Sequence, residues 1–216
     1  MRNIVIVIGA VTLWTSVGVA AEPSARDLSA EAQRECNLGR QAMERTTRLA
    51  HFEKSQVLAE RAVKHDERSA EAHFALFCSL GEQMRIDGET FSTSSVLGFR
   101  RMMKALDRTL QLNPEHLDAL SSKGTFLVRL PGLLGGDAAK GEEMLRRVIQ
   151  RAPTAINARM TLARSYAGRG QTHEAMMLAS EALQLAEAEN RLDLLPEART
   201  LVSELRDRYG ERRAER

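Results

Sequence analysis

The regular spacing of apolar residues between Pro153 and Leu185 constrains the fold more than any other feature of the chain. Apolar residues recur at helical intervals on both sides of Gly170, and several of them are small: Leu162, Ala163, Tyr166, Ala175, Ala179, Ala182 and Leu183. Small side chains let two helices cross closely, and larger ones bury the face that the helices share. Gly170 stands where the chain must reverse. The spacing therefore predicts a helical hairpin over residues 155–187.

The same pattern recurs in weaker form earlier in the chain. Pro114 begins a similar unit, 39 residues before Pro153. Aromatic residues make up only 4% of the sequence, and few segments alternate as strands do. We expect an all-α fold, a solenoid of about four helix-turn-helix hairpins with a C-terminal capping helix. The domain would span residues 29–209, and residues 210–216 would form a charged tail. Its helices are predicted at 29–49, 51–64, 69–85, 98–112, 115–129, 138–151 and 194–209, besides the hairpin above.

Two connecting segments are unusual for such hairpins. In the first, Pro131 breaks a helix, two glycines follow, and Asp137 is predicted to cap the next helix. The same turn holds Leu133 and Leu134, although turns normally face water. We expect these leucines to pack inward or to contact a ligand or partner. The second segment, residues 87–97, is predicted as a long loop, which is either functional or a plain surface insertion.

Residues 1–21 have the composition of a secretory signal peptide. Arg2 precedes an apolar run, and Val19, Ala20 and Ala21 supply the small residues of a cleavage site. An uncleaved membrane anchor is the alternative, but the run is short for a span and no basic residue follows it. We therefore expect cleavage after Ala21, a flexible lead-in over residues 22–28, and a periplasmic protein with no membrane span after cleavage.

The chain has two cysteines, Cys36 and Cys78, both within predicted helices. An oxidising compartment would permit a disulfide between them. The alternative is that both are small buried residues on neighbouring helices. The sequence leaves the two possibilities open.

The sequence offers no pattern typical of a catalytic, metal or cofactor site. None of its histidines stands in a metal-binding spacing, and no nucleophile elbow or phosphate loop occurs. Adjacent carboxylates such as Glu142 and Glu143 are expected on solvated helix faces. A net charge of +2 provides no bulk attraction for nucleic acid. We predict a protein that is not an enzyme, carries no cofactor and does not bind nucleic acid.

The concave surface is the expected binding site, because the first helix of each hairpin lines it in a solenoid. Counting along the repeats places there a column of three arginines, each able to bind a carboxylate with two hydrogen bonds: Arg40, Arg129 and Arg164. The alternative is that these are ordinary solvated side chains. Further residues are predicted on the same surface: Asn37, Glu44, Arg48, Phe74, Cys78, Glu82, Ser121, Thr125, Asn157 and Met160.

The hairpins resemble those of the tetratricopeptide family over about residues 36–187, most clearly in the last pair. A closer resemblance is to the T-component family of TRAP transporters, in which a Leu-Gly-Gly-Asp turn precedes a helix. Here the turn is formed by Leu134, Gly135, Gly136 and Asp137. This resemblance implies a periplasmic helical protein with a cleft between its hairpins. Such a cleft would bind a small hydrophobic ligand or the substrate-binding protein of a transport system.

Two functions follow as hypotheses. The first is an exported protein that binds a protein partner through its concave groove. The second is an accessory of a periplasmic transport system that binds a small hydrophobic or acidic ligand, with Leu133, Leu134 and the segment 87–97 framing an apolar cleft.

Overall fold

The computed structural model describes residues 22–87 and 93–214, and all regular structure in this part of the chain is helical. The predicted signal peptide lies outside the described residues. Four hairpins follow one another in sequence: α1 (Ala25–Gln41) with α2 (Arg45–His65), α3 (Ala70–Asp87) with α4 (Thr93–Leu112), α5 (Leu117–Arg129) with α6 (Ala138–Arg151), and α7 (Ile156–Gly168) with α8 (Thr172–Ala188). A last helix, α9 (Leu195–Ala214), packs against α8.

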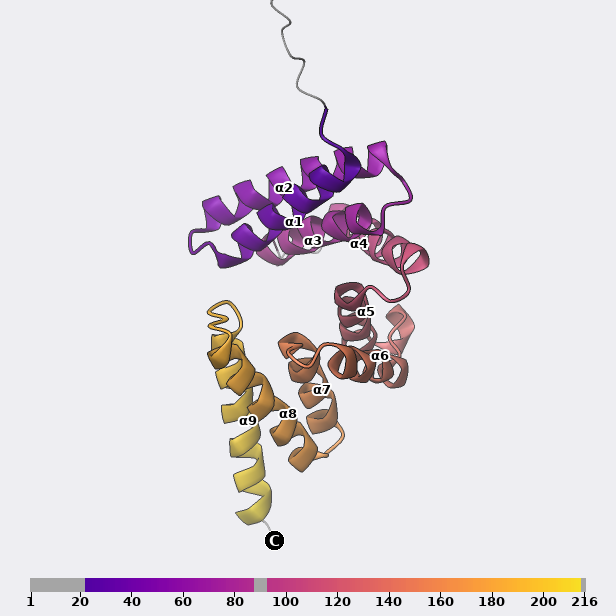
Figure 1. The fold of residues 1–216 in the computed structure, drawn as a ribbon. Helices are drawn as coiled ribbons and strands as arrows, with labels where there is room; N and C mark the ends of the chain where they lie inside the picture. The colour runs from indigo at the N-terminus through magenta and orange to yellow at the C-terminus, as the bar shows by residue number, and fades with distance from the viewer. Residues whose placement is uncertain (1–21, 88–92, 215–216) are drawn as a thin grey trace, which may run out of the picture.

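The arrangement confirms the predicted all-α solenoid of hairpins with a C-terminal capping helix. Each helix packs mainly on its hairpin partner and on the first helix of the next hairpin. Figure 1 shows the stack bending where α4 leads into α5, so that the half containing α1–α4 faces the half containing α5–α9. The bend places α1 and α3 opposite α7 and α9.

Several predicted boundaries were wrong. Ser24 and Asp27 form a capping box that starts α1 at Ala25, so Leu28 is buried in a helix rather than flexible. The chain leaves α1 at Ala42, not near Leu49, because the reversal must fall midway for α1 and α2 to pack along their lengths. Glu44 consequently precedes α2 and does not extend the inner face of α1.

Two further helices are longer than predicted. Helix α4 begins at Thr93, so residues 93–97 belong to a helix and only 88–92 of the expected loop lie outside the described residues. Serine and threonine favour the first turn of a helix as well as loops, which explains the error. Helix α9 continues to Ala214, so most of the predicted tail is helical backbone.

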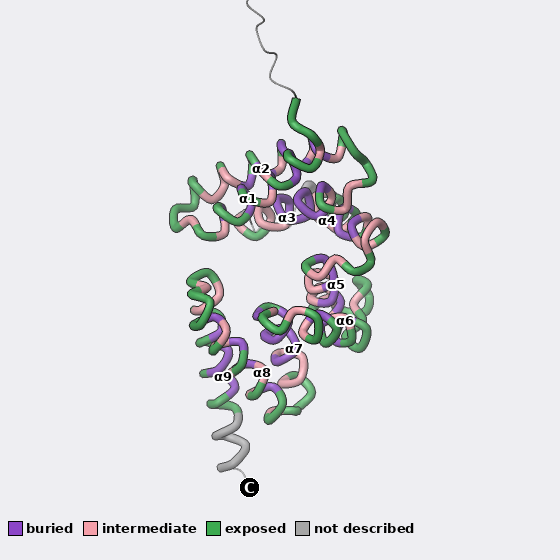
Figure 2. Tube along the Cα trace, viewed as in Figure 1, coloured by how far each residue is buried: buried purple, intermediate pink, exposed green. Residues whose placement is uncertain are grey.

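Small residues bring neighbouring helices into close contact. A Cβ at Gly124 in α5 would lie 2.9 Å from the carbonyl oxygen of Gly141 in α6. A Cβ at Gly141 would lie 2.7 Å from the carbonyl oxygen of Gly124. Ala175, Ala179 and Ala182 are likewise fully buried along α8. Figure 2 shows the buried positions concentrated where helices meet and the exposed ones on the outside of the stack.

The glycine-rich turn before α6 has a structural explanation. Gly135 has a φ of 86°, in the left-handed region that favours glycine. A Cβ at Gly136 would collide with the carbonyl oxygen of Leu130, and the Asp137 side chain accepts a hydrogen bond from the Lys140 backbone N–H. These contacts account for the motif as a chain reversal and a helix cap. Inward packing of the turn leucines was a wrong prediction, because Leu133 is 100% exposed and Leu134 is also exposed.

The two cysteines form a disulfide that ties α1 to α3. Their Cα atoms are 6.5 Å apart, and both side chains are buried against Phe52. One helical turn further along both helices, the Arg40 Nε donates to the Glu82 carboxylate at 2.7 Å. The covalent bond and the ion pair thus form two successive links between the same two helices.

Reduction of the disulfide is expected to lower the free energy of unfolding by about 4 kcal/mol, because the bond closes a long loop in the unfolded chain. The two cysteines are 42 residues apart in the sequence, which sets the length of this loop. Urea unfolding with and without dithiothreitol measures the difference. A Cys36→Ala/Cys78→Ala variant is the control and should not respond to the reductant. Equal stability of the oxidised and reduced wild-type protein would contradict the prediction.

Candidate functional site

A groove with a volume of about 470 Å³ runs along the concave side of the bend. It is lined by α1, α3 and α4 from one half of the stack and by α5, α7 and α9 from the other. These helices face one another across the inside of the bend in Figure 1. The groove therefore depends on the relative position of the two halves.

The groove brings together most of the residues that the sequence placed on the concave surface. The predicted residues that line it are Arg40, Cys78, Glu82, Ser121, Thr125, Arg129, Asn157, Met160 and Arg164. Phe74 does not line it. Its ring is buried and lies 4.5 Å from the ring of His116, because the start of α5 covers this turn of α3. Arg48 lies on α2 and Leu133 and Leu134 lie in the turn before α6, and none of them lines the groove.

The groove has an apolar floor that the sequence analysis missed. Phe126 of α5 lies edge-on to Phe77 of α3, with ring centroids 6.2 Å apart, and to Phe99 of α4, with centroids 6.0 Å apart. Met102 and Met160 extend the floor along α4 and α7. Half of the chain's phenylalanines thus meet in one place. Phe99 and Met102 were missed because only first helices of hairpins were assigned to the concave surface, whereas Phe77 and Phe126 lie on first helices at positions that the repeat count did not assign to it.

Ion pairs occupy most of the groove's charged side chains. The Glu82 carboxylate binds Arg40 at 2.7 Å and Arg85 at 2.8 Å, and Arg164 binds Glu197 at 2.9 Å. Among the described residues, Arg129 makes no ion pair or hydrogen bond, although its side chain is exposed in the groove. The predicted arginine column is therefore uneven. Two of its members are neutralised within the protein, and Arg129 remains available.

The charged side chains near Arg40 shift one another's pKa values. Burial alone would raise the pKa of Glu82, but the positive charges of Arg40 and Arg85 hold it below its ordinary value of 4.5. A hydrogen bond from Arg191 lowers the pKa of Asp193 in the α8–α9 turn, and the charge of Arg40 contributes to the same shift. Arg40 thus interacts electrostatically with a carboxylate in each half of the stack.

Polar groups line the C-terminal wall of the groove. The Thr125 hydroxyl donates to the Ser121 carbonyl at 2.8 Å and lies 3.4 Å from the Thr161 hydroxyl. Ser122 and the exposed Asn157 lie along the same wall. Together with Arg129 they provide donors and acceptors beside an apolar floor. Such a combination suits the binding of an amphipathic segment or molecule.

One expectation about carboxylates was wrong. Glu142 is only 3% exposed, whereas its neighbour Glu143 faces solvent. Glu142 accepts a hydrogen bond from the Ser165 hydroxyl at 2.5 Å and binds Arg169 at 2.8 Å. Its position on the side of α6 that faces α7 explains the burial, and the pairing compensates its charge. This cluster joins the third hairpin to the fourth.

Within residues 22–87 and 93–214, no group of three or more metal-binding side chains is close enough to hold a metal ion. In the same part of the chain, no helix has the length and apolar character needed to cross a membrane.

No protein-family model matches the chain, and no curated protein matches its sequence. Among solved structures, similar chains include "MamA 41-end from Desulfovibrio magneticus RS-1", with 16% identity, a TM-score of 0.45, and coverage of 82% of this chain and 94% of that one. Another is TTC0263, a thermophilic TPR protein in Thermus thermophilus, with 20% identity, a TM-score of 0.43 and coverage of 79% and 98%. A third is YrrB, described as a TPR protein with an unusual peptide-binding site, with 13% identity, a TM-score of 0.36 and coverage of 81% and 99%.

We expect a Glu82→Gln variant to be less stable than the wild type at neutral pH and equally stable in acid. Because the folded pKa of Glu82 is lowered, the carboxylate's contribution is present above the unfolded pKa and is lost as the pH falls below 4.5 through the folded value. Urea unfolding at a series of pH values measures the difference. Glu143→Gln, on an exposed face of α6, controls for the loss of a carboxylate outside the groove. A difference that persists unchanged at low pH would disprove this assignment.

Proposed function

We propose that the protein is an exported, non-enzymatic binding protein that holds a segment of a protein partner in its concave groove. The groove itself carries this proposal. It combines an apolar floor of Phe77, Phe99 and Phe126 with a polar wall and the available guanidinium of Arg129. Its lining comes from both halves of the stack, so one bound segment contacts helices far apart in the sequence.

The chemistry of the groove defines the segment that fits it. Apolar or aromatic side chains would pack on the phenylalanine floor, where burying them is favourable. A carboxylate of the segment would bind Arg129 with two hydrogen bonds, and Asn157 and Ser122 would bind its backbone. Because Arg40 and Arg164 already have carboxylate partners, one acidic group rather than a run of them matches the groove. The partner segment is therefore mainly apolar with a single acidic side chain.

Export of the protein is part of the proposal. Residues 1–21 have the pattern of a signal peptide, and Val19, Ala20 and Ala21 suit cleavage before Glu22. The Cys36–Cys78 disulfide supports an oxidising compartment, since such bonds are rare where thiols are kept reduced. A periplasmic location agrees with both features.

Site-specific photo-crosslinking tests the groove directly. A photoreactive residue at Asn157 is expected to form discrete adducts with a protein partner, whereas one at Val57, exposed on α2 outside the groove, should not. Arg129→Glu should reduce the adducts at least ten-fold, because it replaces attraction for the acidic group with repulsion. Arg206→Glu, on an exposed part of α9, is the matched control and should leave them unchanged. Equal adducts from both positions, or equal effects of the two charge reversals, would refute partner binding in the groove.

A second candidate is the ligand-binding accessory role that the T-component resemblance implies. The groove volume favours it, since about 470 Å³ lies in the range of small-molecule sites. For this role the candidate ligand site is the phenylalanine floor and not the two turn leucines, because Leu133 and Leu134 do not line the groove. A small hydrophobic acid would place its tail on this floor and its carboxylate on Arg129.

Native mass spectrometry of the protein released gently from its own compartment separates the two candidates. The partner-binding proposal predicts bare protein or a complex with another polypeptide. A bound mass of a few hundred daltons that is released on unfolding, and lost in Arg129→Glu but retained in Arg206→Glu, would establish the ligand-binding role instead.

A further inference from the structure

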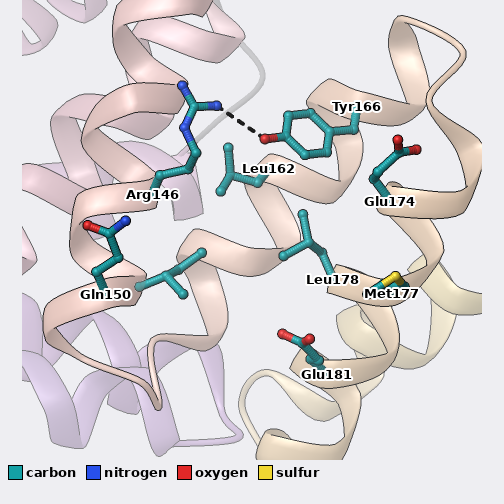
Figure 3. A pocket seen from close by; sticks show the side chains of 9 residues that line it. Arg146, Gln150, Leu162, Tyr166, Glu174, Met177, Leu178 and Glu181 are labelled. Atoms are coloured by element: carbon teal, nitrogen blue, oxygen red, sulfur yellow. Dashed lines mark hydrogen bonds between the residues drawn. The ribbon is translucent and has the colours of Figure 1, made fainter.

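A second hollow lies between α6 and α8 and shares no residue with the concave groove. We call it the α6–α8 trough, and its volume is about 340 Å³. Its lining residues are Arg146, Ile149, Gln150, Leu162, Tyr166, Glu174, Met177, Leu178 and Glu181. Figure 3 shows α6 and α8 as its two walls, with Leu162 of α7 and Leu178 pointing into the space between them.

The trough exposes apolar surface that its own helices do not cover. Helix α6 packs on α5 and α7, and α8 packs on α7 and α9, so the space above α7 is left open. Ile149 and Leu178, both half-buried, form the floor, and Leu162, which also lines the trough, is only 1% exposed. Met177 stands on the α8 wall with 52% of its surface exposed. A solvated methionine beside an apolar hollow is typical of a surface that packs against a partner.

The two walls differ in charge. On the α8 wall, Glu174 and Glu181 stand seven residues apart, which places them two turns apart on the same side of the helix. Glu181 binds Arg159, but Glu174 makes no ion pair or hydrogen bond among the described residues. On the α6 wall, Arg146 donates to the Tyr166 hydroxyl at 3.1 Å and lies 3.6 Å from Glu142. The α8 wall therefore carries an unpaired negative charge at Glu174, whereas on the α6 side Arg146 shares the single carboxylate of Glu142 with Arg169.

The upper end of the trough is held in place by the Glu142 cluster. Glu142 binds Ser165 and Arg169 of the fourth hairpin, and the Arg169 guanidinium lies 5.2 Å from the centroid of the Tyr166 ring. These contacts fix α6 against α7 and orient Arg146 and Tyr166 at the rim. The hollow is thus present before any partner binds, which lowers the entropic cost of binding.

We propose that the α6–α8 trough binds an amphipathic α-helix of a partner protein, with apolar side chains on one face and lysine or arginine along the edge that faces α8. Apolar side chains of such a helix would pack on Ile149, Leu178 and Met177. A lysine or arginine on the edge of the bound helix that faces α8 would pair with Glu174. A helix fits better than an extended strand, because both walls are helices whose backbone groups are already paired and offer no edge to a strand.

Two synthetic peptides of 18 residues test the proposal on the full-length oxidised protein. One places leucines on one helical face and lysines along one edge of that face, and the other replaces every lysine with glutamate. Fluorescence anisotropy measures both dissociation constants. The lysine peptide should bind at least ten-fold more tightly than the glutamate peptide. Absence of binding by the lysine peptide, or equal binding of the two peptides, would overturn the proposal.

Variants locate the binding and control for fold. Met177→Glu should weaken binding of the lysine peptide at least ten-fold, whereas Val57→Glu, an equally exposed apolar position on α2, should not change it. Glu174→Lys should reduce the preference for the lysine peptide over the glutamate peptide, which a purely structural role of Glu174 would not do. Circular dichroism melting verifies that each variant is folded. Equal effects of Met177→Glu and Val57→Glu would show non-specific binding. A dimer of the protein that Met177→Glu abolishes would assign the trough to a second copy and also overturn the proposal.

Discussion

The contacts that join α3 and α4 to α5 determine the shape of this protein. Phe126 packs against Phe77 and Phe99, and His116, which caps α5, stacks on Phe74 and binds Glu71. Between α4 and α5 themselves, the Lys123 ammonium binds Asp107 at 2.7 Å beside the Phe99–Phe126 contact. The bend that forms the concave groove therefore depends on a small aromatic cluster, and the same cluster supplies the floor of the groove. Fold and candidate site share one set of residues, so changes to the floor also affect the bend.

Much of the architecture could be predicted because helical periodicity survives in single sequences. The hairpin around Gly170 and the cap at Asp137 were read correctly, since each depends on residues close together in the chain. The first hairpin was misread because its reversal carries no glycine or proline. Packing between α1 and α2 fixes that reversal, and such long-range contacts leave no local pattern.

The candidate site was predictable only in part. Counting repeats found Arg129, Asn157 and Arg164, because a residue's place in a hairpin determines which face it occupies. The count failed to show that Arg164 is paired with Glu197 from α9, a helix 33 residues away in sequence, or that Phe99 enters from the second helix of a hairpin. Whether an arginine is available to a ligand depends on its partners in space, and the one-dimensional pattern does not contain them.

The links between α1 and α3 have a mechanical consequence. Cys36 is joined covalently to Cys78, and the chain between them contains all of α2. When the protein is pulled from its two ends, tension passes from α1 to α3 through the sulfur atoms and does not act along α2. About 140 Å of contour length is thereby withheld from extension, at roughly 3.4 Å for each of the 42 residues. The first hairpin thus contributes little length to a stretched chain, and forced extension draws mainly on the helices after Cys78.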